Sequence, residues 1–184
     1  MIANPSDGGP APAADVESQL LAEAVIDSLA RNPAPNPPPL DHAALWRHAR
    51  RRAGDVVDLS TARRLREDPV ARNVLGRMIA ARAMACSPMA YAAADATAAT
   101  RMIGVYAVEL LPAGDDGIAA LVIEVPAGAP APAALRAEWL GASVVLDLPP
   151  PQEGLIELFF APAAPGSAEA VAVLGEPTAL IALE

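Results

Sequence analysis

The sequence contains no lysine and only one cysteine, and each of these shortages excludes certain kinds of chemistry. Without lysine, the chain cannot form a Schiff base, use a lysine general base or supply the lysine of a phosphate-binding loop. Because Cys86 is the only thiol, no disulfide can form within the chain and no multi-cysteine zinc site can close in it. All thirteen basic residues are arginine, which a GC-rich coding bias explains at least as readily as a functional choice.

Aromatic residues are also scarce, at 3% of the chain, whereas hydrophobic residues make up 53% and are mostly alanine, valine and leucine. The core must therefore be built from many small side chains. We expect a substitution in such a core to cost less stability than the loss of a buried phenylalanine or tryptophan.

Long hydrophobic runs are missing as well. The longest apolar tract, residues 80–94, is interrupted by Arg82 and Pro88 and consists mostly of alanine, so it falls short of a membrane-spanning helix. Residues 1–12 have neither the basic region nor the apolar region of a signal peptide. We therefore expect a soluble cytoplasmic protein.

Charge is distributed very unevenly along the chain. Residues 46–82 hold ten arginines against four carboxylates, a net charge of +6, whereas residues 101–184 hold two arginines against eleven carboxylates, a net charge of −9. Two modules with opposite electrostatic fields are therefore expected.

The first forty residues predict three segments. Residues 1–14 lack periodicity and are expected to be a disordered tail. Residues 32–40 contain five prolines and predict an extended spacer. Residues 15–31, between them, predict a tethered amphipathic helix, which we expect to bind a surface of this chain, a second subunit or another protein. Its apolar stripe includes Leu21, Val25 and Leu29.

Residues 41–100 are rich in arginine and alanine and predict a helical region. Side chains that can cap a helix start stand at Asp41, Ser60 and Asp68, because such side chains accept hydrogen bonds from unpaired amides there. The expected helices cover residues 42–53, 61–67, 69–87 and 89–100.

From residue 101 the apolar period changes from about 3.6 towards 2, which is typical of strands. Residues 135–140 fit either a strand or a short helix. The spacing predicts that residues 101–184 form an autonomous antiparallel β-sandwich or small barrel, so the chain is expected to be α+β. The other expected strands cover residues 102–111, 118–125, 143–148, 155–161, 170–174 and 178–183.

No combination of residues has the spacing of a catalytic or metal site. His42 and His48 are about 120° apart on a helix, so they are poorly placed to serve one site, and we interpret both as solvated. Cys86 has an apolar neighbourhood and is expected to be a structural thiol. Asp115 and Asp116 lack the loop spacing of a calcium site. We therefore expect no enzymatic activity, no metal and no cofactor.

The arginine cluster is the one group of residues with a functional interpretation. Arg47, Arg50 and Arg51 lie together on one side of a predicted helix. Together with Arg52, Arg63, Arg64 and Arg66 they could meet phosphates, because two short helices in tandem allow a helix-turn-helix. The interleaved carboxylates, the net charge of −9 and the lack of any stacking aromatic other than Trp46 favour a different target. That target is carboxylate, on a partner or on the acidic half of this chain.

This layout resembles, in organisation alone, bacterial regulators that sequester or scaffold another protein, although the histidine and cysteine spacing of the zinc-binding anti-sigma type is absent. We expect a non-enzymatic adaptor or regulator that binds another protein through its helical part, with the β domain as a second interaction surface or as a site of self-association. Two alternatives stay open: a nucleic-acid-associated regulator that uses the arginine-rich helices, and an accessory subunit of an enzyme complex. The expected contact residues are Leu21, Val25, Leu29, Arg47, Arg50 and Arg51.

Overall fold

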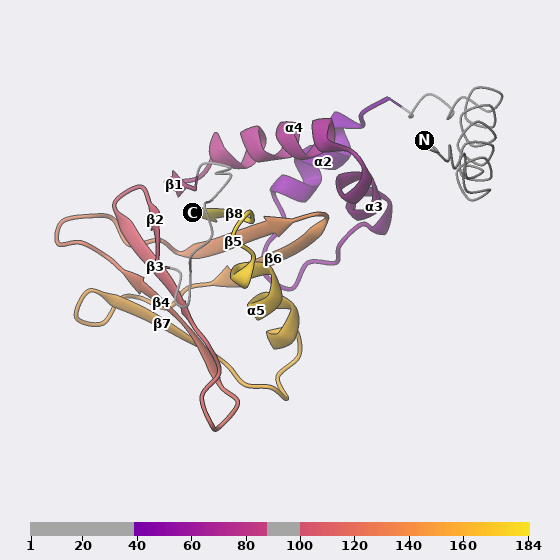
Figure 1. Cartoon of the computed structure of the whole chain (residues 1–184). Helices are drawn as coiled ribbons and strands as arrows, with labels where there is room; N and C mark the ends of the chain where they lie inside the picture. Colours follow the sequence, from indigo (N-terminus) through magenta and orange to yellow (C-terminus); the bar gives the residue numbers. More distant parts are fainter. Residues whose placement is uncertain (1–38, 88–99) are drawn as a thin grey trace, which may run out of the picture. The chain divides into compact units, whose positions relative to one another are not determined.

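The structure, a computed structural model, describes residues 39–87 and 100–184 (Figure 1). The predicted tail, the predicted first helix, nearly all of the proline-rich spacer and nearly all of the predicted helix 89–100 lie outside these described residues. The elements within them are α2 (His42–Ala49), α3 (Leu59–Glu67), α4 (Pro69–Ala80), β1 (Ala85–Cys86), β2 (Arg101–Ile103), β3 (Tyr106–Leu111), β4 (Ala119–Glu124), β5 (Ala134–Trp139), β6 (Ala142–Asp147), β7 (Leu155–Phe160), α5 (Ser167–Gly175) and β8 (Leu180–Leu183).

The described strands form two sheets of four strands each, and every pairing in them is antiparallel. One sheet has the strand order β1-β8-β5-β6, and we call it the covered sheet. The other has the order β2-β3-β4-β7, and we call it the open sheet. Because the described residues combine helices with two antiparallel sheets, the predicted α+β class is confirmed.

The open sheet shows the alternation expected of strands with one buried face. In β4, Ile123 is buried, whereas Val122 is half-buried and Glu124 is exposed. The register places Val108 of β3 and Ile156 of β7 beside Ile123. Buried side chains therefore form rows across the inner face of this sheet, and half-buried or exposed side chains form rows across its outer face.

The covered sheet differs because its two central strands are buried on both faces. β8 is buried at every position, and β5 is buried from Leu135 to Glu138. Leu135 and Ala137 belong to the core between the strands, whereas Arg136 and Glu138 lie on the opposite face and contact the segment around the end of α2.

One hydrophobic core draws on both sheets and on α5. Ile123 and Ile156 come from the open sheet, Leu135 and Ile181 come from the covered sheet, and Val173 comes from α5. A core of this size, shared by strands that are distant in sequence, accounts for most of the apolar burial that stabilises the described residues.

The predicted strand 170–174 is wrong, because these residues belong to α5. A short run of alanine and valine fits either period. Here Ala170, Val173 and Leu174 are buried at positions i, i+3 and i+4, so the helical period applies. Gly166, with a φ of +78°, starts the helix in a conformation that favours glycine.

The helix starts follow the caps that the sequence provides, but two helices are shorter than predicted. Asp41 and Asp68 cap α2 and α4 as expected, while Asp58 caps α3 in place of Ser60. Helix α2 ends at residue 49 rather than 53, and α4 ends at residue 80 rather than 87. The chain after α4 instead forms β1, which pairs with the edge of β8.

The remaining strand predictions are close to the observed strands. The segment predicted as one strand over residues 102–111 is a hairpin, because Gly104 with a φ of +61° turns the chain between β2 and β3. Residues 135–140, which fitted either type of element, are mostly strand β5. The arginine-rich helices and the acidic strands both belong to one compact unit, Asp41–Glu184. Independent folding of residues 101–184 stays a prediction.

Candidate functional site

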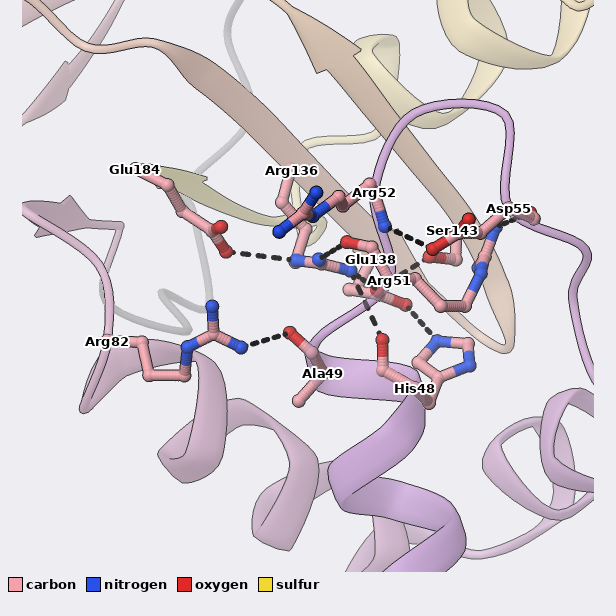
Figure 2. A network of polar contacts seen from close by, with 10 residues as sticks. All are labelled: His48, Ala49, Arg51, Arg52, Asp55, Arg82, Arg136, Glu138, Ser143 and Glu184. Atoms are coloured by element: carbon pink, nitrogen blue, oxygen red, sulfur yellow. Dashed lines mark hydrogen bonds and ion pairs between the residues drawn. The ribbon is translucent and has the colours of Figure 1, made fainter.

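A network of polar side chains joins the end of α2 to the covered sheet, and we call it the ionic joint (Figure 2). At its centre lies Arg136 of β5, whose side chain is only 1% exposed. A buried charge is tolerated only when its hydrogen-bonding groups are satisfied by partners. The ionic joint consists of His48, Arg51, Arg136, Glu138, Ser143 and Glu184.

The guanidinium of Arg136 has acceptors on every nitrogen. Its Nε donates to Glu184 Oε1 at 3.2 Å, and its Nη1 lies 3.4 Å from both Glu138 Oε1 and the carbonyl oxygen of His48. Its Nη2 donates to the carbonyl oxygen of Arg51. Arg136 therefore ties together β5, β8 and the segment that follows α2.

The contacts with backbone carbonyls satisfy hydrogen-bond acceptors at the end of α2. The last carbonyl groups of a helix have no amide partner within the helix, and the partial negative charge there favours cations. Arg136 reaches the carbonyl of His48, and Arg82 Nη1 donates to the carbonyl of Ala49 at 3.2 Å. Arginine side chains from outside α2 thus cap its carboxyl end.

Glu138 balances the positive charge of Arg136. Its Oε2 accepts from His48 Nε2 at 3.2 Å, and its Oε1 accepts from Ser143 Oγ at 2.6 Å. Ser143 lies directly opposite Glu138 in the pairing of β5 with β6. The carboxylate is therefore held from the helix and from the neighbouring strand at once.

A serine, a histidine and a glutamate in contact invite comparison with a catalytic triad, but their order is different. In a triad the histidine lies between the hydroxyl and the carboxylate. Here Glu138 lies in the middle, and Ser143 donates to it rather than to His48. All three residues are buried, and His48 Nδ1 has no hydrogen-bond partner among the described residues. The geometry suits structural support rather than nucleophile activation.

Arg51 enters the same joint from the segment after α2. Its Nη2 donates to the carbonyl oxygen of Asp55 at 2.9 Å, while its Nε and Nη1 are buried without a hydrogen-bond partner among the described residues. Burial lowers the pKa of the Arg51 guanidinium, and the nearby carboxylate of Glu138 opposes that shift. Arg51 is therefore directed into the protein, unlike Arg47 and Arg50.

The turn between β5 and β6 locks the helices to the covered sheet at a second point. Leu140 and Gly141 both have positive φ, of 44° and 84°. A Cβ atom at Gly141 would clash with the carbonyl oxygen of Ala62 in α3, and would lie 3.2 Å from the amide nitrogen of Arg66. Only glycine allows this turn to approach the helix backbone so closely.

A cleft of about 370 Å³ opens beside the ionic joint, between α3 and α4 on one side and the β5–β6 turn on the other. Its volume lies within the range of small-ligand pockets. Glu138 and Asn73 supply polar groups, whereas Leu65, Trp139 and Leu180 supply apolar surface. The cleft has room for an apolar side chain of a partner.

The predicted contact residues fall into three groups. Leu21, Val25 and Leu29 lie outside the described residues. Arg47 and Arg50 are exposed on α2 and at its carboxyl cap. Arg51 is separated from them and takes part in the ionic joint.

The ionic joint was not predicted from the sequence, and the interpretation of His48 as solvated is wrong, because His48 is 3% exposed. Leu45, His48 and Ala49 occupy positions i, i+3 and i+4, so they share the face of α2 that packs inward. That spacing was the available signal for His48. Arg136 and Glu138 gave none, because charged residues that alternate with apolar ones in a strand ordinarily face solvent.

Cys86 is a half-buried free thiol on β1, consistent with its interpretation as structural. Burial raises the pKa of this thiol, which disfavours the reactive thiolate. Within residues 39–87 and 100–184, no group of three or more histidine, cysteine, aspartate or glutamate side chains could hold a metal ion. No helix in that part of the chain is long and apolar enough to cross a membrane.

Comparison of the chain with protein-family models, with curated proteins and with solved structures finds no match.

Proposed function

We propose that the protein is a non-enzymatic adaptor or regulator that binds an acidic surface of another protein through the outward face of α2. The main observation in support of this proposal is a group of three side chains, Trp46, Arg47 and Arg50, which we call the α2 patch. All three side chains are exposed, and Trp46 is 43% exposed. Such residue types dominate the energetics of protein interfaces.

The α2 patch is one continuous strip because of helix geometry. At about 100° per residue, Trp46, Arg47 and Arg50 fall within roughly 100° of arc. The buried residues Leu45, His48 and Ala49 occupy the other side of the helix. The guanidinium carbon of Arg50 lies 5.9 Å from the centroid of the Trp46 ring, a cation–π arrangement. Neither Arg47 nor Arg50 forms an ion pair with a described carboxylate.

A protein partner fits this patch better than nucleic acid does. Three of the seven arginines in the predicted cluster are already engaged, because Arg51 is drawn into the ionic joint and Arg63 and Arg64 pair with neighbouring carboxylates. The net charge of −9 on the whole chain repels a polyanion over distances comparable to the Debye length, about 8 Å at physiological salt. A partner carboxylate cluster needs only a short-range match to Arg47 and Arg50.

The scaffold behind the patch is, in this proposal, a small β-sandwich. The single core that draws on both antiparallel sheets supports that interpretation. The ionic joint and the Gly141 contact hold α2 on this scaffold, so the patch would be presented on a rigid body. Rigid presentation reduces the entropy lost on binding.

The test is capture of partners from a lysate of the source organism with the wild-type chain and with the double variant Arg47→Glu/Arg50→Glu. We expect the variant to lose a partner that the wild type captures. The matched control, Arg66→Glu/Arg77→Glu, makes the same charge change at exposed positions of α3 and α4 and should retain the partner. Equal stability of both variants in urea would show that binding, not folding, has changed.

Binding of duplex DNA and of RNA at rising salt, measured with the same proteins, tests the main alternative. We expect weak binding from the wild type even at low salt. Tight binding that falls steeply with salt and disappears in Arg47→Glu/Arg50→Glu would replace the proposal with the nucleic-acid-associated regulator.

A further inference from the structure

In the described part of the chain, the open sheet ends in a strand whose outer edge pairs with no other strand. In the order β2-β3-β4-β7, strand β7 has a neighbour on one side only among the described residues. The strand is six residues long and lies beside a hollow of about 610 Å³. Pro149 and Pro150, in the segment before the strand, also line this hollow. Exposed edges of this kind are where extended segments of other proteins add a strand.

The hydrogen bonds show which groups of β7 face the open edge. Gly154 accepts from Val125 at 2.7 Å, so its carbonyl points towards β4. Leu155 uses both its amide and its carbonyl on Gln152, at 2.9 Å and 2.8 Å, on the opposite side. Alternate residues of an antiparallel strand point their backbone groups the same way. The residues that follow Leu155 on its side of the strand are therefore unpaired in the described ladder.

Those residues are Glu157 and Phe159. Together they offer two amides and two carbonyls to an added strand, and no backbone partner for them is present among the described residues. Their side chains also share the outer face of the open sheet, where Phe159 is 68% exposed while its neighbour Phe160 is only 7% exposed. An added strand would thus meet both an open backbone and an exposed ring.

The charge of the face restricts what can bind there. Glu109 and Glu157 lie in one row on either side of Val122, and Glu124 lies in the adjacent row. The outer positions of the open sheet hold no arginine, and none of these glutamates pairs with a described cation. The face is therefore apolar and acidic, and a cationic segment complements it.

We propose that β7 is a docking edge for an extended segment of another protein, with a basic residue opposite Glu157 and an apolar residue two positions away, opposite Phe159. Directly opposed side chains in an antiparallel pair are close enough to interact. This inference takes only the class of partner, a protein, from the proposed function. Its site is separate from the α2 patch.

Other occupants fit less well. Two copies of β7 paired about a two-fold axis at Glu157 would place the two Glu157 side chains directly opposite each other, and like charges directly opposed destabilise a pair. Residues 1–40 carry five carboxylates against one arginine, so they also repel this face. Ten of the thirteen arginines lie between residues 46 and 82, where the described elements are helices rather than strands.

The test uses the full chain, labelled with ¹⁵N, and a capped synthetic hexapeptide, acetyl-Thr-Phe-Thr-Arg-Thr-Lys-amide. We expect saturable shifts and slower hydrogen exchange at the amides of Glu157 and Phe159. N-methylation of the peptide at Phe and Arg removes the amides that face β7 and should weaken binding about tenfold, the size expected for two lost hydrogen bonds. N-methylation at the two central threonines serves as the matched control and should retain binding.

Two protein variants complete the test. Glu157→Arg should abolish peptide binding, whereas Asp115→Arg, the same charge change in an exposed turn, should bind as the wild type does. Arg47→Glu/Arg50→Glu should also bind the peptide normally, so failure of the α2 patch and failure of the β7 edge are distinguishable. The inference is overturned by a wild type that does not bind the peptide, by equal loss on both N-methylations, or by a wild-type dimer whose interface protects Glu157 and Phe159.

Discussion

The covered and open sheets both carry charged residues, but Arg136 and Glu138 of the covered sheet are buried whereas Glu157 of the open sheet is exposed. On the helix-facing side of the covered sheet, Arg136 and Glu138 are buried and bonded to the segment around the end of α2. On the outer face of the open sheet, Glu157 lies beside Phe159, and both are exposed. A charge on a strand is therefore no guide to its role until the element that covers the strand is known.

The difference has a structural origin in how each sheet meets the rest of the chain. In the covered sheet, β1 follows shortly after α4 and pairs with β8, and the turn at Gly141 packs against α3. The helices are therefore fixed to this sheet at several points. In the open sheet, Phe159 on the outer face is exposed, and the edge of β7 beyond Leu155 pairs with no strand among the described residues. The covered side holds the helices to the strands, and the open side is the one that we propose for binding.

Removing the covering is expected to have the largest effect. Residues 101–184 expressed without residues 41–87 keep most of the shared core but lose β1 and expose Arg136 and Glu138. We expect a β-type circular dichroism spectrum and a cooperative transition at a much lower midpoint than that of residues 41–184. An equal midpoint would show that the helices add nothing, and a helical spectrum would contradict the predicted β domain.

The next effect in size is expected from Arg136→Met. This change leaves Glu138 and the carbonyls of His48 and Arg51 without their buried partner. Removing one member of a buried ion pair typically destabilises a protein by about 3–5 kcal/mol. Urea unfolding measures the change, and Arg77→Met on the exposed side of α4 should shift stability by no more than about 0.5 kcal/mol.

Gly141→Ala tests the second contact of the covered sheet. The new methyl group meets the backbone of α3, and overpacking of this kind costs about 1–3 kcal/mol in addition to the strain of a positive φ. Gly128→Ala is the matched control, because Gly128 has a φ of +82° and nothing within 4 Å of the added carbon. Equal losses of stability in the two variants would mean that the close approach to α3 contributes nothing.

The smallest effect concerns acid and the start of α3. Hydrogen bonds from the hydroxyls of Thr61 and Ser60, and from the amide of Ser60, hold the pKa of Asp58 below its usual value. Its contribution is therefore fully present above the unfolded pKa, near 4, and is lost as pH falls through the lower folded pKa. Asp58→Asn keeps a capping oxygen without that titration, so its stability should fall less steeply with acid. Parallel acid profiles of the two proteins would contradict this assignment.

Much of the fold follows from sequence, because period and turn chemistry are local. Gly and Pro turns and apolar alternation gave β4, β6 and β7 to within a residue or two, and Asp41 and Asp68 marked two helix starts. The strand prediction for residues 170–174 was wrong because five small apolar residues fit both the helical and the strand period. Only their contact with the core selects the helix.

The candidate site was less predictable, since it depends on contacts between residues far apart in the chain. His48 and Glu138 are 90 residues apart, and nothing local indicates that they meet. The prediction for the arginine cluster treated Arg47, Arg50 and Arg51 alike, whereas the end of α2 at Ala49 turns Arg51 inward. Helix length, which sequence fixes poorly, thus decides which arginines are available to a partner.

The contrast between the two sheets is tested most directly by one paired measurement: the free energies of unfolding of Glu138→Gln and Glu157→Gln, each relative to the wild type. Both changes remove one charge with almost no change in shape. Because Glu138 is buried against Arg136 and His48, we expect its variant to lose several kcal/mol, whereas Glu157→Gln should stay within about 0.5 kcal/mol. Equal losses in the two variants, or a larger loss for Glu157→Gln, would contradict the account.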